Sequence, residues 1–163
     1  HSLCKLLSLY KQIHFTLISP TELSMPQSIL DAITQGGHKL TITDQLSGSV
    51  DADICYQTRI QEERFTSQDE ADKFRGKFRL DQQIYTKHFQ SKTVIMHPLP
   101  RDSRAEANEL DNDLNQHPNL AIFRQTDNGV LVRMALFALS LGVENLLQQY
   151  EQPVLWHTSK STL

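Results

Sequence analysis

The stretch Thr93-Val94-Ile95-Met96, followed at once by His97-Pro98-Leu99-Pro100-Arg101, is the part of the chain that most clearly indicates the fold. Three of its first four residues are β-branched, which predicts a short buried strand, and the prolines that come next end it. Asp53-Ile54-Cys55-Tyr56 is also predicted as a short strand, and Thr58 and Arg59 follow it after Gln57. Short apolar strands that end in polar or proline-rich loops are typical of a parallel sheet.

Helix and strand signals alternate over the residues before these two strands. Apolar residues at helical spacing predict a helix over residues 2–10, and a strand is expected at residues 13–18. Pro26 opens a second helix, Gly36-Gly37 ends it, and a strand at residues 40–43 follows. This rhythm predicts an α/β fold, a three-layer, doubly wound and mainly parallel sheet with helices on both faces. Ligands of such sheets bind outside the carboxyl ends of the strands, where both loops fall.

Composition and charge narrow the class of protein. The chain has 163 residues, 39% hydrophobic and 21% charged, which fits one globular domain. A net charge of -3 and scattered basic residues argue against nucleic acid as a partner. The most apolar run, residues 130–141, contains Arg133 and is too short to span a bilayer, so no membrane role is expected. Cys4 and Cys55 make no disulfide framework, which favours a reducing, cytoplasmic location. The seven histidines have no metal-ligand spacing.

The arginine loop, residues 57–64, carries the first candidate binding group. Arg59 presents a planar fork of N–H donors that matches a carboxylate, and such a pair both holds and orients a ligand. Gln61 lies on the same side of an extended segment and can add an amide contact. Glu62 or Glu63 is placed to steady the arginine. The alternative is that residues 59–64 form a solvated, salt-bridged start of a helix, which is the common fate of charge runs.

The proline turn, residues 97–101, carries the second candidate binding group. Its prolines remove backbone donors but leave carbonyl oxygens, so the turn is a stiff row of acceptors suited to an amine or amide N–H. The Leu99-Pro100 bond is a candidate for the cis form. The alternative is a rigid turn without a binding role. His97 is a possible acid or base, although a histidine at such a turn is more often a hydrogen-bonded structural residue.

Three ordered segments together resemble aspartate carbamoyltransferase: residues 56–65, residues 97–101 and residues 128–136. Further similarity at His1-Ser2-Leu3 and Leu23-Ser24-Met25-Pro26 extends the resemblance over nearly the whole chain. Ornithine-specific relatives carry His-Cys-Leu-Pro in the turn and a Ser-Met-Gly motif. This chain has His97-Pro98-Leu99-Pro100 and no Ser-Met-Gly, so the aspartate enzyme is the better match.

The resemblance implies a Rossmann-like carbamoyltransferase domain that works in transfer of a carbamoyl group from carbamoyl phosphate to L-aspartate, in pyrimidine biosynthesis. By similarity, Arg59 and Gln61 bind L-aspartate, and the backbone of Pro98, Leu99 and Pro100 positions carbamoyl phosphate and the attacking amine. The supporting residues are then Glu63, Arg64, His97 and Arg101. The family implies no metal, no cofactor and no catalytic residue within this half. It also implies a homotrimer, with regulatory chains as possible partners.

Two family motifs, Ser-Thr-Arg-Thr for the phosphate and His-Pro-x-Gln for the carbonyl, are absent. They belong to an amino-terminal carbamoyl phosphate domain, and a chain that opens on His1 looks cut from something longer. Residues 1–150 are therefore expected to be the aspartate-binding domain, and residues 151–163 a tail with Trp156 as its only large anchor. No roles are transferred to residues 102–118, where the spacing departs from the family. The alternative function is a free-standing module that binds a dicarboxylate amino acid or acts as an assembly partner.

The last predicted helix, over residues 130–143, is apolar around most of its circumference, because only Arg133, Ser140 and Gly142 interrupt it. Such a helix needs cover on all sides. It is either a central core helix or, as the resemblance favours, it packs in part on the missing half. In the second case the chain on its own exposes an apolar patch.

Overall fold

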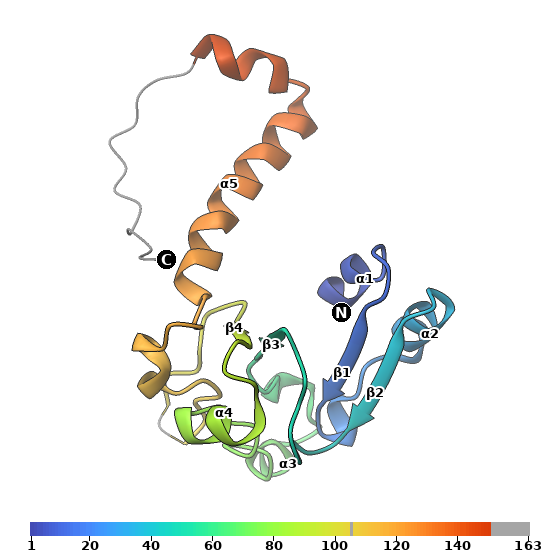
Figure 1. The fold of residues 1–163 in the computed structure, drawn as a ribbon, viewed down its shortest axis with the longest axis vertical. Helices are drawn as coiled ribbons and strands as arrows, with labels where there is room; N and C mark the ends of the chain where they lie inside the picture. The colour runs from blue at the N-terminus through green and yellow to red at the C-terminus, as the bar shows by residue number, and fades with distance from the viewer. Residues whose placement is uncertain (105, 151–163) are drawn as a thin grey trace.

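The computed structural model describes residues 1–104 and 106–150, so the tail expected at residues 151–163 lies outside the described residues. Helices and strands follow one another along the chain as predicted, although the second and third strands have no helix between them (Figure 1). The strands are β1 (His14–Ile18), β2 (Lys39–Thr43), β3 (Ile54–Tyr56) and β4 (Val94–Met96). The α-helices are α1 (Ser2–Leu7), α2 (Gln27–Gln35), α3 (Gln68–Asp72), α4 (Gln82–His88) and α5 (Ile122–Leu141). Four 3-10 helices are described: η1 (Thr21–Leu23), η2 (Glu62–Arg64), η3 (Asn112–Gln116) and η4 (Glu144–Tyr150).

The strands pair in parallel, which confirms the α/β class expected from the sequence. Strand β1 pairs with β2, and β3 pairs with β4 with Cys55 opposite Ile95. Ile95 also forms a parallel bridge to Leu120 on its other side. Within the described part of the chain the strands form two two-stranded sheets and not one continuous sheet. Apolar runs identify strands but do not say which strands pair, and this part of the topology was not readable from the sequence.

Each pair of strands has its own apolar core. On one face of β1–β2, Phe15 packs with Ile29 and Ile33 of α2, while the other face is polar and carries a 3.0 Å contact between His14 Nε2 and Thr41 Oγ1. Helices therefore cover one face of this pair. The larger core lies around β4 and consists of Leu80, Tyr85, Ile95, Leu110, Leu114 and Ile122. It holds β4, and with it the start of the proline turn, at a fixed place.

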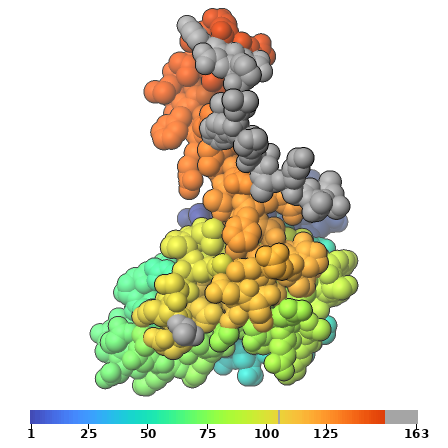
Figure 2. All heavy atoms as spheres, turned by 90° about the vertical axis from the view of Figure 1, so that its left-hand side faces the viewer, coloured from blue at the N-terminus to red at the C-terminus, as the bar shows by residue number. Residues whose placement is uncertain are grey.

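Helix α5 extends away from the body of the molecule (Figures 1 and 2). It begins eight residues before the predicted helix, and it ends at Gly142, whose φ of 64° is left-handed. Seven of its large apolar side chains are 56–72% exposed: Leu131, Val132, Met134, Leu136, Phe137, Leu139 and Leu141. The interpretation of this segment as a central core helix is therefore wrong, and the expected apolar surface is present.

Two properties of residues 1–104 and 106–150 concern function. No helix there has the length and apolar character needed to cross a membrane. The same residues contain no cluster of three or more His, Cys, Asp or Glu side chains arranged to hold a metal ion.

Candidate functional site

The arginine loop and the proline turn leave the same edge of the β3–β4 sheet. Tyr56 and Met96, the last residues of the two strands, are register partners, and the Gln57 N–H donates to the Met96 carbonyl at 2.9 Å. The position predicted for both segments, after the carboxyl ends of parallel strands at one sheet edge, is the one the chain adopts.

Arg59 is held by Glu63 and is still accessible. Its two terminal nitrogens donate to the two carboxylate oxygens of Glu63 at 3.2 and 2.7 Å, and the Arg59 side chain is 44% exposed. A guanidinium has five N–H donors, so this bidentate pair leaves others for a ligand. The pKa of Glu63 is lowered, first by a hydrogen bond with its own backbone and then by Arg59 and Arg64. The arginine thus has a fixed orientation without being covered.

Gln61 and Arg64 flank this pair. The half-buried Gln61 caps η2, its carbonyl accepts the Arg64 N–H at 3.0 Å, and its side-chain amide has no hydrogen-bond partner among the described residues. Arg64 is exposed, and its positive charge helps to lower the pKa of Glu63. The predicted alternative for this loop, a salt-bridged solvated segment, describes the local geometry accurately, and such geometry does not prevent Arg59 from binding a carboxylate.

The proline turn has the predicted cis Leu99-Pro100 bond, and Leu99 has a φ of 53°. Pro98 and Pro100 are exposed, whereas His97 is buried. His97 Nδ1 accepts the Leu99 N–H at 2.8 Å, its Nε2 lies 2.7 Å from Glu109 Oε1, and its backbone N–H donates to Gln125 Oε1 at 3.1 Å. This is the hydrogen-bonded structural histidine that the sequence favoured.

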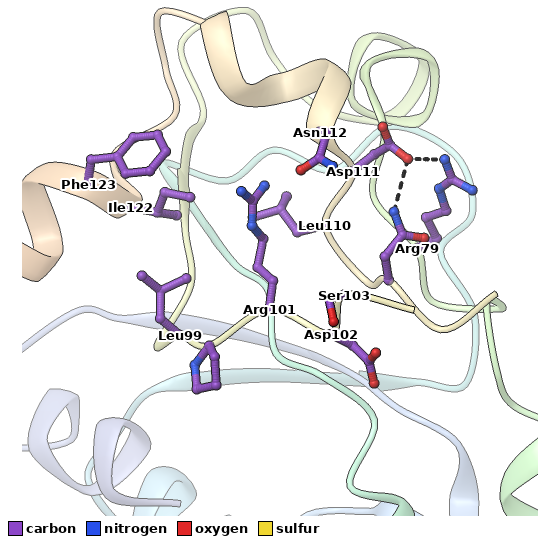
Figure 3. Close-up of a pocket in the computed structure, with 12 residues that line it drawn as sticks. Arg79, Leu99, Arg101, Asp102, Ser103, Leu110, Asp111, Asn112, Ile122 and Phe123 are labelled. Atoms are coloured by element: carbon purple, nitrogen blue, oxygen red, sulfur yellow. Dashed lines mark hydrogen bonds and ion pairs between the residues drawn. The ribbon is translucent and has the colours of Figure 1, made fainter. Parts of the chain in front are cut away.

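A cavity of about 780 Å³ lies beside the turn (Figure 3). Arg101 points into it and donates to Asn115 Oδ1 at 2.9 Å. Its lining is mixed, with an Arg79–Asp111 ion pair on one side and Ile122 and Phe123 on the other. Leu99, Pro100, Asp102 and Ser103 line it too, together with Asn108, Leu110 and Asn112. Arg59 and Gln61 are not among the residues that line this cavity.

A charge network joins the two loops; of its members only Glu62 had a role expected from the sequence, and it pairs here with Arg104 and Arg75, while Glu63 is the acid that pairs with Arg59. Arg104 donates to Asp102 at 2.6 Å and to Glu62 at 2.8 Å, and Arg75 also pairs with Glu62 at 3.3 Å. The hydrogen bonds from Arg104 lower the pKa of Asp102 to about 2, with a smaller contribution from the positive charge of Arg59. The pKa of Glu62 is lowered mainly by its hydrogen bond from Arg75. Through Arg104 the network connects Asp102, which follows the proline turn, with Glu62 in the arginine loop.

Comparison with known proteins identifies the family. Residues 1–140 match the family described as aspartate/ornithine carbamoyltransferase, Asp/Orn-binding domain. The chain belongs to this family. It is 63% identical over 160 residues to the aspartate carbamoyltransferase catalytic subunit of Cellvibrio japonicus, covering 98% of this chain and 47% of the relative. It is also 56% identical to the aspartate carbamoyltransferase catalytic subunit of Saccharophagus degradans, and the match covers 99% of this chain and 48% of that relative. The chain spans about half the length of the curated relatives it matches.

Solved structures of this carbamoyltransferase family give the same result. Aspartate transcarbamoylase from Trypanosoma cruzi, in complex with carbamoyl phosphate and aspartate, is 33% identical with a TM-score of 0.71, covering 84% of this chain and 44% of that one. The catalytic subunit from M. jannaschii aspartate transcarbamoylase has the same identity, TM-score and coverage. The α/β carbamoyltransferase fold expected from the resemblance is thus confirmed.

Proposed function

We propose that this chain is the aspartate-binding half of an aspartate carbamoyltransferase, which transfers a carbamoyl group from carbamoyl phosphate to L-aspartate in pyrimidine biosynthesis. The observation that carries the proposal is Arg59, an accessible guanidinium oriented by Glu63 at the sheet edge from which the proline turn also leaves. Its relatives of high identity are named as this enzyme, and one solved relative holds both substrates. The free-standing binding module is the alternative that the experiment below distinguishes.

In the proposed reaction Arg59 binds a carboxylate of aspartate and Gln61 adds an amide contact. The carbonyl oxygens of Pro98, Leu99 and Pro100 position the amine and the carbamoyl group. The amine attacks the carbamoyl carbon, a C–N bond forms, the C–O bond to phosphate breaks, and phosphate leaves with the electron pair while the amine loses a proton. The contribution of this half is alignment, which can account for much of the rate of such a two-substrate reaction.

The other half of the site is proposed to come from an amino-terminal domain of the same polypeptide. The phosphate and carbonyl motifs expected there are absent from this chain, and the exposed apolar surface of α5 is suited to packing on another domain. A homotrimer of the full catalytic chain, possible regulatory chains and a cytoplasmic location belong to the same proposal. Residues 1–150 are proposed as the domain.

The test is the aspartate kinetics of the full-length polypeptide that contains this chain, with Arg59→Ala. A charge-assisted hydrogen bond contributes about 1.5–3 kcal/mol, so the KM for aspartate should rise about 10- to 100-fold while that for carbamoyl phosphate changes little. Lys92→Ala is the matched control, because Lys92 is an exposed cation two residues before β4, at the strand end opposite the turn. Unchanged aspartate kinetics in Arg59→Ala would remove Arg59 from the site. An inactive wild-type protein that still binds aspartate would favour the binding module.

A further inference from the structure

A buried acid contacts both ends of the proline turn. The side chains of His97 and Glu109 are 1% and 2% exposed, and His97 Nε2 lies 2.7 Å from Glu109 Oε1. Both oxygens of Glu109 also lie within reach of the Asp102 N–H, at 3.3 and 3.2 Å. His97 precedes the two prolines and Asp102 follows them. A single buried carboxylate thus connects the entry and the exit of the turn.

The ring of His97 has a defined tautomer in this arrangement. Its Nδ1 accepts the Leu99 N–H at 2.8 Å, so that nitrogen carries no proton and the ring proton is on Nε2, which faces Glu109. The Nε2–Oε1 distance is short, but the buried Nε2 does not meet the geometry of a hydrogen bond, so the contact with Glu109 is electrostatic. A carboxylate removed from water is costly unless polar groups compensate it, and here Nε2–H and the Asp102 N–H are the groups that face it.

The backbone held in this way is not one that leucine adopts easily. Leu99 has a φ of 53°, in the left-handed region, where a residue with a side chain pays about 1–2 kcal/mol. Its N–H is bound by His97, whose own N–H is bound by Gln125 at the start of α5. The contacts of Glu109 and Gln125 therefore hold a conformation that the local sequence alone disfavours.

We propose that Glu109 is a positioning residue, which acts through His97 and the Asp102 N–H to fix the carbonyl oxygens of Pro98, Leu99 and Pro100. This inference rests on the proposed function, because those carbonyls are the groups that align the amine and the carbamoyl group. Glu109 touches no substrate. Its removal shifts the turn, and a misplacement of about 1 Å in an aligned site costs about 100-fold in rate.

The test uses the full-length polypeptide with Glu109→Gln and Glu109→Ala, and with Glu106→Gln as control, because Glu106 is an exposed acid in the same segment. We expect kcat to fall about 10- to 100-fold in Glu109→Ala and less in Glu109→Gln, which keeps an acceptor for the Asp102 N–H. The KM for aspartate should stay within a few-fold of wild type, because Arg59 is unaffected. This pattern is the reverse of that expected for Arg59→Ala.

A second readout does not depend on activity. Hydrogen exchange of the peptide covering residues 97–102 should become faster in the Glu109 variants and stay unchanged in Glu106→Gln. A normal kcat together with unchanged exchange would overturn the proposal. A lower thermal stability with a normal kcat in the folded fraction would also overturn it, because Glu109 would then act in folding only. If wild type lacks transferase activity, the proposed function fails, while faster exchange in the variants would still support the positioning of the turn.

Discussion

The exposed apolar surface of α5 predicts that this chain, prepared on its own, self-associates. Its seven large apolar side chains are 56–72% exposed. Full burial of such a side chain stabilises by about 1.5–3 kcal/mol, so covering the exposed part of each contributes about 1–2 kcal/mol. Seven of them give about 7–14 kcal/mol, against an association cost of about 4–15 kcal/mol. With an association cost near the low end, about 4 kcal/mol, the net gain is about 3–10 kcal/mol, and its middle part, about 4–8 kcal/mol, corresponds to a Kd between about 1 mM and 1 μM.

The perturbation is the triple variant Leu131→Gln, Phe137→Gln and Leu139→Gln, which keeps good helix formers in α5. It removes about 3–6 kcal/mol of this gain and should weaken association at least about 100-fold. The matched control changes three exposed apolar residues outside α5 to Gln: Leu6, Leu9 and Tyr10.

Sedimentation velocity and light scattering over a concentration series are the assays, with circular dichroism to confirm that helix content is retained. The wild-type chain and the control should associate and the α5 variant should stay monomeric. A wild-type chain that remains monomeric at millimolar concentration, or a control that behaves like the α5 variant, would refute the reasoning.

Three further outcomes are expected. Glu63→Gln should raise the KM for aspartate several-fold in the full-length protein, because Arg59 loses its orientation. The free energy of unfolding should change by less than about 1 kcal/mol, because the pair is exposed. An unchanged KM would contradict the role of Glu63. The pKa of Asp102 is about 2 and lies below that of an unfolded aspartate, so its pairing stabilises the fold above about pH 4 and this contribution is lost toward pH 2. Arg104→Gln should raise that pKa, which an NMR titration of the carboxyl group measures, and an unmoved midpoint would argue against the pairing. Tyr85→Phe should lower the free energy of unfolding by about 1–3 kcal/mol in urea, because the buried hydroxyl donates to a backbone carbonyl at 2.7 Å; a loss below about 0.5 kcal/mol would contradict its role.

The sequence predicted the parts of the fold that depend on local chemistry. Apolar, β-branched runs located β3 and β4, and Gly37 has the positive φ expected at the end of α2. Proline chemistry predicted the cis bond before Pro100. The division of the strands into two sheets was not predicted, because pairing depends on contacts between segments that are distant in the sequence.

The candidate site shows the same limit. Arg59 and its partner Glu63 are four residues apart, a spacing that the sequence displays directly. Glu109 lies twelve residues after His97, and nothing in that spacing indicates contact. Asp102 and Arg104 alternate in charge, a pattern that points to a local ion pair but not to the link with Glu62 on the other loop.

The most direct test of the central claim is the product formed by the full-length polypeptide that contains these residues. Purified protein is incubated with carbamoyl phosphate and either L-aspartate or L-ornithine, and carbamoylated products are measured by mass spectrometry. The account predicts N-carbamoyl-L-aspartate and phosphate, with little product from ornithine. Carbamoylation of ornithine in preference to aspartate, or no carbamoylation of either by the folded protein, would contradict it.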